Sequence, residues 1–215
     1  MVVTSNPQCW VVTKLELRAG SLADAHAIAA AVAALCRPGD LIVLSGEMGA
    51  GKTAFAKGFG AALGVTEPIT SPTFTLVHTY DLGAGLGNGA KALHHADLYR
   101  LDRTAEVADL ALDELAEYQG IVLVEWGDVV DVFGDHLVVH LEADMPSEDD
   151  SNEDDVGDGD ASDGDVGDGG VGDGDAGDDV SALIDTVRQI EISASGANWA
   201  ARWGRLVAAC EAYRC

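Results

Sequence analysis

The chain carries at residues 46–53 the stretch Gly46-Glu47-Met48-Gly49-Ala50-Gly51-Lys52-Thr53. This stretch matches the phosphate-binding loop pattern G-x-x-x-x-G-K-[ST] at every fixed position. An apolar run at residues 41–45 precedes it and predicts a short buried strand, and residues 52–63 follow it with apolar side chains at helical spacing. Strand, glycine-rich loop and helix in this order let successive backbone N–H groups face one anion at the positive end of a helix. The stretch therefore predicts binding of a nucleoside triphosphate.

The loop residues themselves are the expected nucleotide contacts: Glu47, Met48, Gly49, Ala50, Gly51, Lys52 and Thr53. Lys52 is expected to reach the β- and γ-phosphates, and the Thr53 hydroxyl is expected to hold Mg²⁺, both side chains projecting from the helix start into solvent. Guanine recognition requires an [NT]-K-x-D motif. The nearest match, residues 13–16, precedes the loop and ends in Glu, so ATP is favoured over GTP.

The net charge is unevenly spread along the 215 residues. Residues 147–180 contain 15 Asp or Glu, nine Gly and no Lys or Arg. The rest of the chain has 22 acidic and 12 basic residues, so its net charge is −10, compared with −25 for the whole chain. Such a surface argues against unaided binding of nucleic acid, because phosphate contacts need clustered Lys and Arg. We expect tRNA to be reached only indirectly.

The acidic segment 147–180 has almost nothing to bury, so we expect a disordered insert within a single domain that spans residues 1–215. A calcium site is the alternative, because Asp-x-Asp patterns recur, but no EF-hand or calcium β-solenoid spacing is kept. The four Cys form no C-x-x-C pair, no signal peptide opens the chain, and no helix is long enough to span a bilayer. These features favour a cytoplasmic protein without a membrane partner.

Strand and helix patterns alternate along the chain. We expect strands at residues 11–17, 41–45, 73–80, 92–98, 121–124, 136–141 and 187–192, and helices from about 22 to 36 (capped by Ser21), at 52–63, at 104–118 (capped by Thr104) and at 198–213. The pattern predicts an α/β P-loop NTPase fold with a mainly parallel sheet flanked by helices and an antiparallel C-terminal hairpin, which the acidic insert interrupts.

A phosphate-binding loop needs a second carboxylate for Mg²⁺ and a group that manages the attacking water. Glu125 ends the most apolar strand, where ligands bind in open α/β sheets, and is the expected second metal ligand beside Thr53. Asp97 lies near the end of another strand and is expected to orient water or to act as an outer-sphere magnesium ligand. Its alternative role is in a turn or in an ion pair with Arg100 or Arg103. Thr73 follows Pro72 and is a candidate switch hydroxyl near the γ-phosphate, or simply a strand entry. Trp126 is expected near the nucleotide.

Four motifs in order carry a family resemblance: residues 46–53, Ser71-Pro72-Thr73-Phe74-Thr75-Leu76-Val77, His95-Ala96-Asp97-Leu98-Tyr99-Arg100-Leu101 and Val124-Glu125-Trp126. Together they resemble the bacterial TsaE (YjeE) family, small ATPases of tRNA threonylcarbamoyladenosine biosynthesis. The resemblance implies an ATPase that acts with the TsaB and TsaD proteins. It also implies that Thr53 and Glu125 bind Mg²⁺. Asp97 is then expected to have a catalytic or water-positioning role and Thr73 a switch role, with Lys52 as the third catalytic residue.

Two other functions share the phosphate-binding loop. A small-molecule kinase usually carries an arginine-rich lid, whereas the longest insert here is acidic and would repel phosphates. A nucleotide-regulated binding switch would use hydrolysis only to time the release of a partner. Stimulation of turnover by partner proteins separates the assembly ATPase from a kinase, which needs only a small acceptor.

Overall fold

The computed structural model describes residues 13–83, 89–101, 107, 110–127, 134–144 and 187–215. Its strands are β1 (Thr13–Ala19), β2 (Leu41–Ser45), β3 (Val77–Asp81), β4 (Ala92–Asp97), β5 (Gly120–Glu125), β6 (His136–Ala143) and β7 (Arg188–Ser195). Its helices are α1 (Leu22–Ala33), α2 (Lys52–Ala62), α4 (Leu112–Glu117), α5 (Ala197–Ala200), α6 (Trp203–Ala209) and the short 3₁₀ turn η4 (Glu211–Tyr213).

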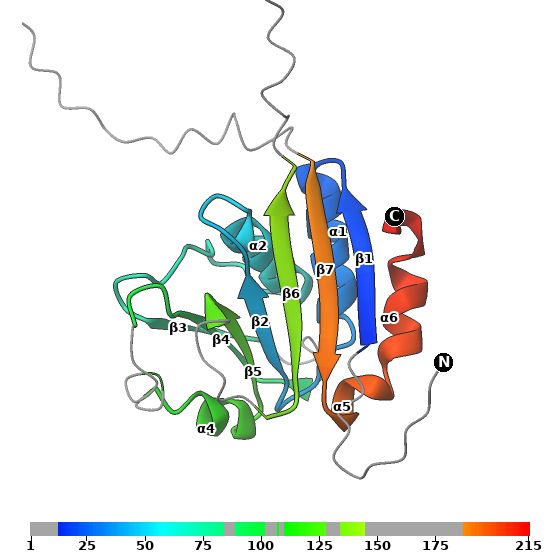
Figure 1. Cartoon of the computed structure of the whole chain (residues 1–215). Helices are drawn as coiled ribbons and strands as arrows, with labels where there is room; N and C mark the ends of the chain where they lie inside the picture. The colour runs from blue at the N-terminus through cyan, green and yellow to red at the C-terminus, as the bar shows by residue number, and fades with distance from the viewer. Residues whose placement is uncertain (1–12, 84–88, 102–106, 108–109, 128–133, 145–186) are drawn as a thin grey trace, which may run out of the picture.

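The strands form one sheet in the order β1-β7-β6-β2-β5-β4-β3. Its centre is parallel, because β2 pairs with β6 and β5, and β5 pairs with β4. Antiparallel strands flank this centre: β3 pairs with β4 at one edge, and at the other edge β7 pairs with β6 and β1 with β7. The predicted α/β fold with a parallel centre and an antiparallel β6–β7 hairpin is confirmed (Figure 1).

Side chains of β2 alternate between the two faces of the sheet. Ile42 and Leu44 join the larger core, in which α1 and α2 pack against the sheet, whereas Leu41 and Val43 join a smaller core that includes residues of α4. Every residue of β2 and β5 is buried, as expected of central parallel strands that are covered on both faces. Because these central strands are parallel, the carboxyl ends of β2, β4 and β5 lie at the same end of the sheet. Figure 1 shows α1 and α2 behind the sheet.

Three predicted elements are wrong in extent. Residues 73–76 form a turn instead of the start of a strand, because the N–H groups of Thr75 and Leu76 both donate to the Pro72 carbonyl and β3 begins only at Val77. A continuous helix over 104–118 is excluded by Ala111, whose φ of 48° starts α4 afresh. The predicted helix 198–213 is divided into α5, α6 and η4.

Other expectations lie outside the described residues: the disordered acidic insert 147–180, the Thr104 cap and the first two residues of the predicted strand 11–17. Ser21 caps α1 as predicted, with its hydroxyl oxygen accepting from the Asp24 N–H at 3.2 Å. Among the residues that are described, no helix combines the length and the apolar character needed to cross a bilayer. Cys36, Cys210 and Cys215 are free thiols, and burial raises the pKa of Cys210 to about 11.

A buried ion pair ties the C-terminal helices to the start of β2. Both guanidinium NH₂ groups of Arg202 donate to the Asp40 carboxylate, one of them at 2.8 Å, and the same side chain donates to the Leu35 and Asn198 carbonyls. Asp40 and Arg202 are 6% and 2% exposed. Because the charges compensate each other, removing one partner leaves the other charge buried without compensation.

We therefore expect Arg202→Met to lower the free energy of unfolding by about 3–5 kcal/mol, the range found for broken buried pairs. Arg214→Met is the matched control, because Arg214 pairs with Glu211 at the exposed surface, where such pairs contribute less than about 1 kcal/mol. Urea unfolding monitored by circular dichroism measures both variants. Equal midpoints for the two would show that the buried pair contributes no more than the surface pair.

Candidate functional site

The loop between β2 and α2 depends on glycines at two close approaches. Gly46 has φ 128°, and a Cβ there would collide with the Leu141 carbonyl of β6. Gly51 has φ 102°, and a Cβ there would lie 2.7 Å from Nε of Arg188. Only glycine combines these backbone angles with this lack of space. The loop is thus pressed against the β6–β7 hairpin, and α2 begins with no side-chain cap on its N–H groups.

Lys52 turns back into its own loop. Its ammonium donates to the carbonyls of Gly46 and Glu47, each at 2.7 Å, and lies 3.6 Å from the centre of the Trp126 ring. The side chain is 5% exposed, so the expectation that it projects into solvent is wrong. The ammonium is therefore held at the mouth of the loop by contacts that an incoming phosphate can replace.

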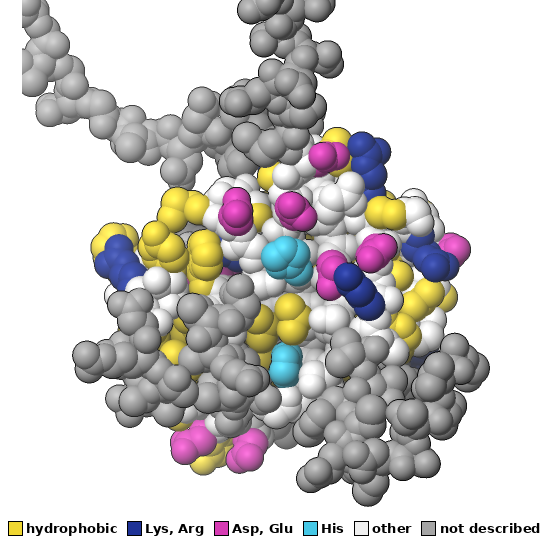
Figure 2. Space-filling view, in the orientation of Figure 1, with side chains coloured by type: hydrophobic (Ala, Val, Ile, Leu, Met, Phe, Trp, Pro, Cys, Tyr) yellow, Lys and Arg dark blue, Asp and Glu magenta, His cyan; other side chains and the backbone are white. Residues whose placement is uncertain are grey.

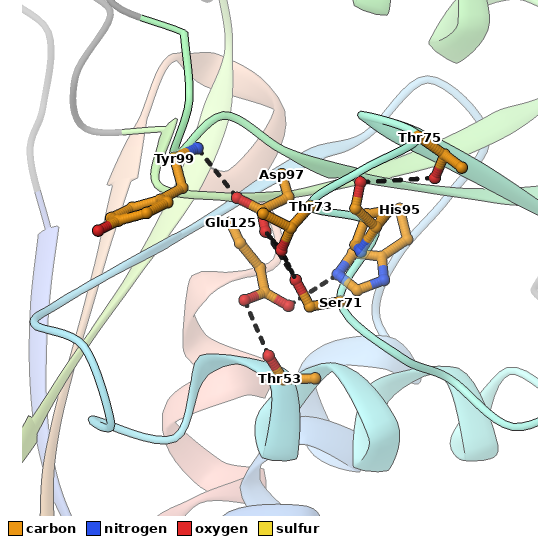
Figure 3. A network of polar contacts seen from close by, with 9 residues as sticks. Thr53, Ser71, Thr73, Thr75, His95, Asp97, Tyr99 and Glu125 are labelled. Atoms are coloured by element: carbon orange, nitrogen blue, oxygen red, sulfur yellow. Dashed lines mark hydrogen bonds and ion pairs between the residues drawn. The ribbon is translucent and has the colours of Figure 1, made fainter. Parts of the chain in front are cut away.

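Thr53 and Glu125 meet, as the sequence predicts for two ligands of one metal ion. The Thr53 hydroxyl donates to Oε2 of Glu125 at 3.0 Å (Figure 3). The other carboxylate oxygen, Oε1, lies 2.9 Å from Nε2 of His95. His95 is fully buried and Nδ1 has no hydrogen-bond partner among the described residues. A bare lone pair is less costly to bury than an unpaired N–H, so the proton belongs on Nε2, from which it is donated to Glu125.

Asp97 lies beside Glu125, because the two residues are register partners in β4 and β5. Its Oδ2 accepts from the hydroxyls of Ser71 at 2.6 Å and Thr73 at 2.7 Å, and its Oδ1 accepts from the Tyr99 N–H at 2.9 Å (Figure 3). The carboxylate is 3% exposed. In the described part of the chain it forms no ion pair with Arg100, and Arg103 lies outside that part. The turn at residues 71–76 thus clamps the carboxylate with two hydroxyls.

Trp126 follows Glu125 directly and adopts φ 62°, a left-handed conformation that is costly for a bulky residue. Its N–H donates to the Leu44 carbonyl at 2.9 Å. The ring stacks at a tilt on Tyr99, with 5.0 Å between ring centres, and covers the Lys52 ammonium. The strained backbone therefore places an aromatic ring over the cation that is expected to bind phosphate.

A cleft of about 700 Å³ opens beside the phosphate-binding loop. Its walls are the loop residues Glu47–Ala50, the end of β6 and its extension (residues 140–144), and Arg188. Arg188 is 2% exposed, donates through Nε to the Ala50 carbonyl at 3.1 Å, and burial lowers its pKa. A mononucleotide fits a cleft of this volume.

Sequence reasoning missed two of these residues. His95 belongs to no metal-ligand pattern in the sequence, yet its place two residues before Asp97 on one strand puts both side chains on the same face of β4. Arg188 gives no signal in the sequence, because it reaches the loop only through the pairing of β7 with β6. Within the described residues no group of three or more His, Cys, Asp and Glu could hold a metal ion, so a metal here would need hydroxyl or phosphate oxygens as well.

Comparisons with known proteins agree on one family. Residues 19–153 match the family model described as "Threonylcarbamoyl adenosine biosynthesis protein TsaE". The protein of that description from Bacillus subtilis is 41% identical over 118 residues, which cover 55% of this chain and 70% of the relative. A Treponema pallidum relative is 39% identical over 99 residues, 46% of this chain and 68% of its own length. Among solved structures, the crystal structure of Bacillus subtilis YdiB superposes with a TM-score of 0.60 at 27% identity, over 92% of this chain and 97% of that one.

We expect the hydrogen bond from His95 to keep the Glu125 carboxylate oriented toward Thr53 and a bound Mg²⁺. His95→Leu should weaken Mg²⁺-dependent ATP binding by about 10–100-fold, the range for lost partners of metal ligands, and His95→Gln, which keeps an N–H donor, should recover most of it. His94→Gln is the matched control, because His94 is buried next to it but faces Thr79, at 2.9 Å. Calorimetry with and without Mg²⁺ measures the effect; equal losses in all three variants would mean that the histidines act on folding alone.

Proposed function

The chain belongs to the TsaE family of threonylcarbamoyl adenosine biosynthesis proteins, and from that premise we propose that it is a Mg²⁺-dependent ATPase that supports threonylcarbamoyl transfer to adenosine in tRNA. The fold is that of a nucleotide-binding protein, with a YdiB-like arrangement of strands around the phosphate-binding loop. One observation carries the proposal: the Thr53 hydroxyl, the Glu125 carboxylate and the Asp97 carboxylate meet at the mouth of that loop.

Phosphate binding rests on groups that are already in place. The Lys52 ammonium has two carbonyl acceptors, which phosphate oxygens can replace with stronger charge-assisted hydrogen bonds. The N–H groups at the start of α2 have no side-chain cap and face the same space. The nucleoside end is expected in the cleft between the loop, the end of β6 and Arg188. These residues support the nucleotide contacts that the loop motif predicts.

Mg²⁺ suits the oxygen atoms at this site. A threonine hydroxyl and a carboxylate 3.0 Å apart are hard donors that one ion can share when the hydroxyl turns its lone pair to the metal. Thr53 and Glu125 would hold it, and His95 would keep Glu125 oriented. Once bound with ATP, Mg²⁺ neutralises charge on the β- and γ-phosphate oxygens.

Asp97 is proposed to orient the attacking water. It is adjacent to Glu125, buried, and held by two hydroxyls that can exchange for a water molecule when the turn at residues 71–76 moves. Thr73 is then the switch hydroxyl, because its hydrogen bond to Asp97 would be kept or broken as that turn rearranges. Lys52 supports the same step by stabilising charge on the transferred phosphoryl group.

Partner proteins of the TsaB and TsaD type are proposed to complete the site, and tRNA is proposed to be reached only through them, in the cytoplasm. The acidic composition argues against direct binding of tRNA. The described residues offer no arginine that contacts both the loop mouth and solvent in the manner of a mobile arginine finger: Arg188 is buried on the loop backbone, and Arg100 lies over Phe74. A partner surface can supply such a group, with rate effects of about 10³–10⁵-fold.

Experiments can distinguish this proposal from a small-molecule kinase and from a nucleotide-regulated binding switch. A small-molecule kinase would transfer phosphate to an added acceptor without partner proteins. A binding switch would bind partners according to nucleotide state and show no effect of hydrolysis on the modification of tRNA. The assembly ATPase is favoured by the family membership and by the acidic segment 147–180, which differs from the arginine-rich lid of a kinase.

Three variants should separate nucleotide binding from hydrolysis. Lys52→Ala should abolish Mg·ATP binding, because the charge that meets the phosphates is lost. Asp97→Asn should keep nucleotide binding within about tenfold, whereas Glu125→Gln should weaken Mg²⁺-dependent binding at least as much as the roughly 10–100-fold expected for His95→Leu without abolishing it. Both should lower partner-stimulated hydrolysis by orders of magnitude, because they remove charge needed in the transition state. Calorimetry and phosphate release measure the two properties. Normal turnover in both carboxylate variants would place the active site elsewhere.

Turnover of the isolated protein should be slow and should rise when TsaB and TsaD proteins are added together. We expect tRNA alone to give no increase, because the acidic chain should not bind it. Phosphate release is to be compared for the protein alone, with tRNA, with TsaB and TsaD, and with all three. Fast turnover of the isolated protein, or full stimulation by tRNA without protein, would favour an independent enzyme.

A further inference from the structure

Phe74 lies at the apex of the turn at residues 71–76 and points into solvent. It is 87% exposed, more than any other large hydrophobic side chain of the described residues. The turn beneath it has a defined backbone conformation: Pro72 is buried, its carbonyl accepts from the N–H groups of Thr75 and Leu76, and Leu76 adopts φ 63°. An ordered loop that presents an aromatic ring to water, with no core to bury it in, is typical of an anchor for a partner.

The surface around Phe74 carries a cation as well. The Arg100 guanidinium lies 4.3 Å from the centre of the Phe74 ring, and Tyr99 beside it is 49% exposed. No carboxylate of the described residues pairs with Arg100. Figure 2 shows hydrophobic side chains gathered with a basic group at the left edge of the molecule, on the side where β3 and β4 lie in Figure 1. We call Phe74, Tyr99 and Arg100 the Phe74 surface.

We propose that the Phe74 surface docks a protein partner that offers an apolar pocket of aromatic size with a carboxylate at its rim. The pocket would take the Phe74 ring and the carboxylate would pair with Arg100; aromatic residues and arginine are the side chains that dominate binding energy at interfaces. This inference rests on the proposed function, because the partner it commits to is the TsaB–TsaD pair.

Charge decides between this partner and two others. RNA could stack on Phe74 and Tyr99, but one arginine on a chain of net charge −25 is a poor match for a phosphate backbone. A second copy of this chain, docked symmetrically at the same surface, would bring two Arg100 guanidinium groups against each other. A partner with acidic groups around an apolar pocket meets neither obstacle.

The position of the surface gives docking a route to the active site. Phe74 is flanked by Thr73, whose hydroxyl donates to Asp97, and the N–H of Tyr99 donates to the other oxygen of the same carboxylate. A partner that binds Phe74 and Arg100 can therefore shift both segments that hold Asp97, one through Thr73 and the other through Tyr99. Such contact can stimulate hydrolysis without the partner reaching the nucleotide itself.

The experiment compares Phe74→Ala with Tyr118→Ala in the full-length protein. Tyr118 is 81% exposed and lies just before β5, at the opposite end of that strand from Glu125, so it is a matched exposed aromatic. Each variant is titrated with purified TsaB and TsaD, and binding is followed by calorimetry and by phosphate release. Phe74→Ala should bind TsaB–TsaD at least about 30-fold more weakly than wild type, the size expected of an anchor residue. Tyr118→Ala should stay within about twofold of wild type, as should ATP affinity and unstimulated turnover in Phe74→Ala.

Arg100→Gln should weaken the same association less than Phe74→Ala and should reduce its dependence on salt concentration. If wild type and Phe74→Ala bind TsaB–TsaD equally well, the proposed docking surface is wrong but the proposed function is unaffected. Wild type that fails to bind TsaB–TsaD overturns both. A Phe74-dependent gain of tRNA binding by the protein alone, or a Phe74-dependent dimer in sedimentation, assigns the surface to RNA or to a second copy and overturns the proposal.

Discussion

The parallel register of three neighbouring strands is the constraint on which the site depends. Leu44, the next-to-last residue of β2, is paired with Glu125 of β5, and Glu125 is paired with Asp97 of β4. Because parallel strands end at the same edge, the loop after β2 and both carboxylates are delivered to one place. A shift of one residue in either pairing would turn a carboxylate to the opposite face of the sheet. The buried apolar side chains of β2 and β5 fix that register from both faces.

The charges of the candidate site are paired with neighbouring protein groups. Lys52 is paired with loop carbonyls and the Trp126 ring, Glu125 with Thr53 and His95, and Asp97 with Ser71 and Thr73. Burying these charges unpaired would cost several kcal/mol each, so the pairing is needed for the domain to fold before a ligand arrives. In the proposed function, nucleotide and metal would exchange these partners for others at little cost, because hydrogen bonds would be replaced instead of being lost.

The two carboxylates differ in what holds them. Glu125 is fixed from inside the sheet by His95, a fully buried side chain on the neighbouring strand. Asp97 is held by Ser71 and Thr73 of a surface turn and by the N–H that follows its own strand. A carboxylate held by the core suits a permanent metal ligand, whereas one held by a surface turn can respond to events outside the molecule. The exposed Phe74 lies on that turn, so the proposed docking surface and the clamp on Asp97 belong to the same segment.

The sequence alone determined the phosphate-binding loop, the α/β class, the identity of the carboxylates and the antiparallel hairpin, because these depend on local spacing and on apolar strands that need both faces covered. It misjudged residues 73–76 and 104–118, where the carbonyl of Pro72 and the left-handed backbone of Ala111 outweigh the apolar pattern. Only the tertiary structure decided that Lys52 is buried, that His95 orients Glu125 and that Arg188 braces the loop. These three facts depend on contacts between residues far apart in the sequence: Lys52 lies under the Trp126 ring, His95 and Glu125 are 30 residues apart, and Arg188 and Ala50 are 138 residues apart. No local pattern records such contacts.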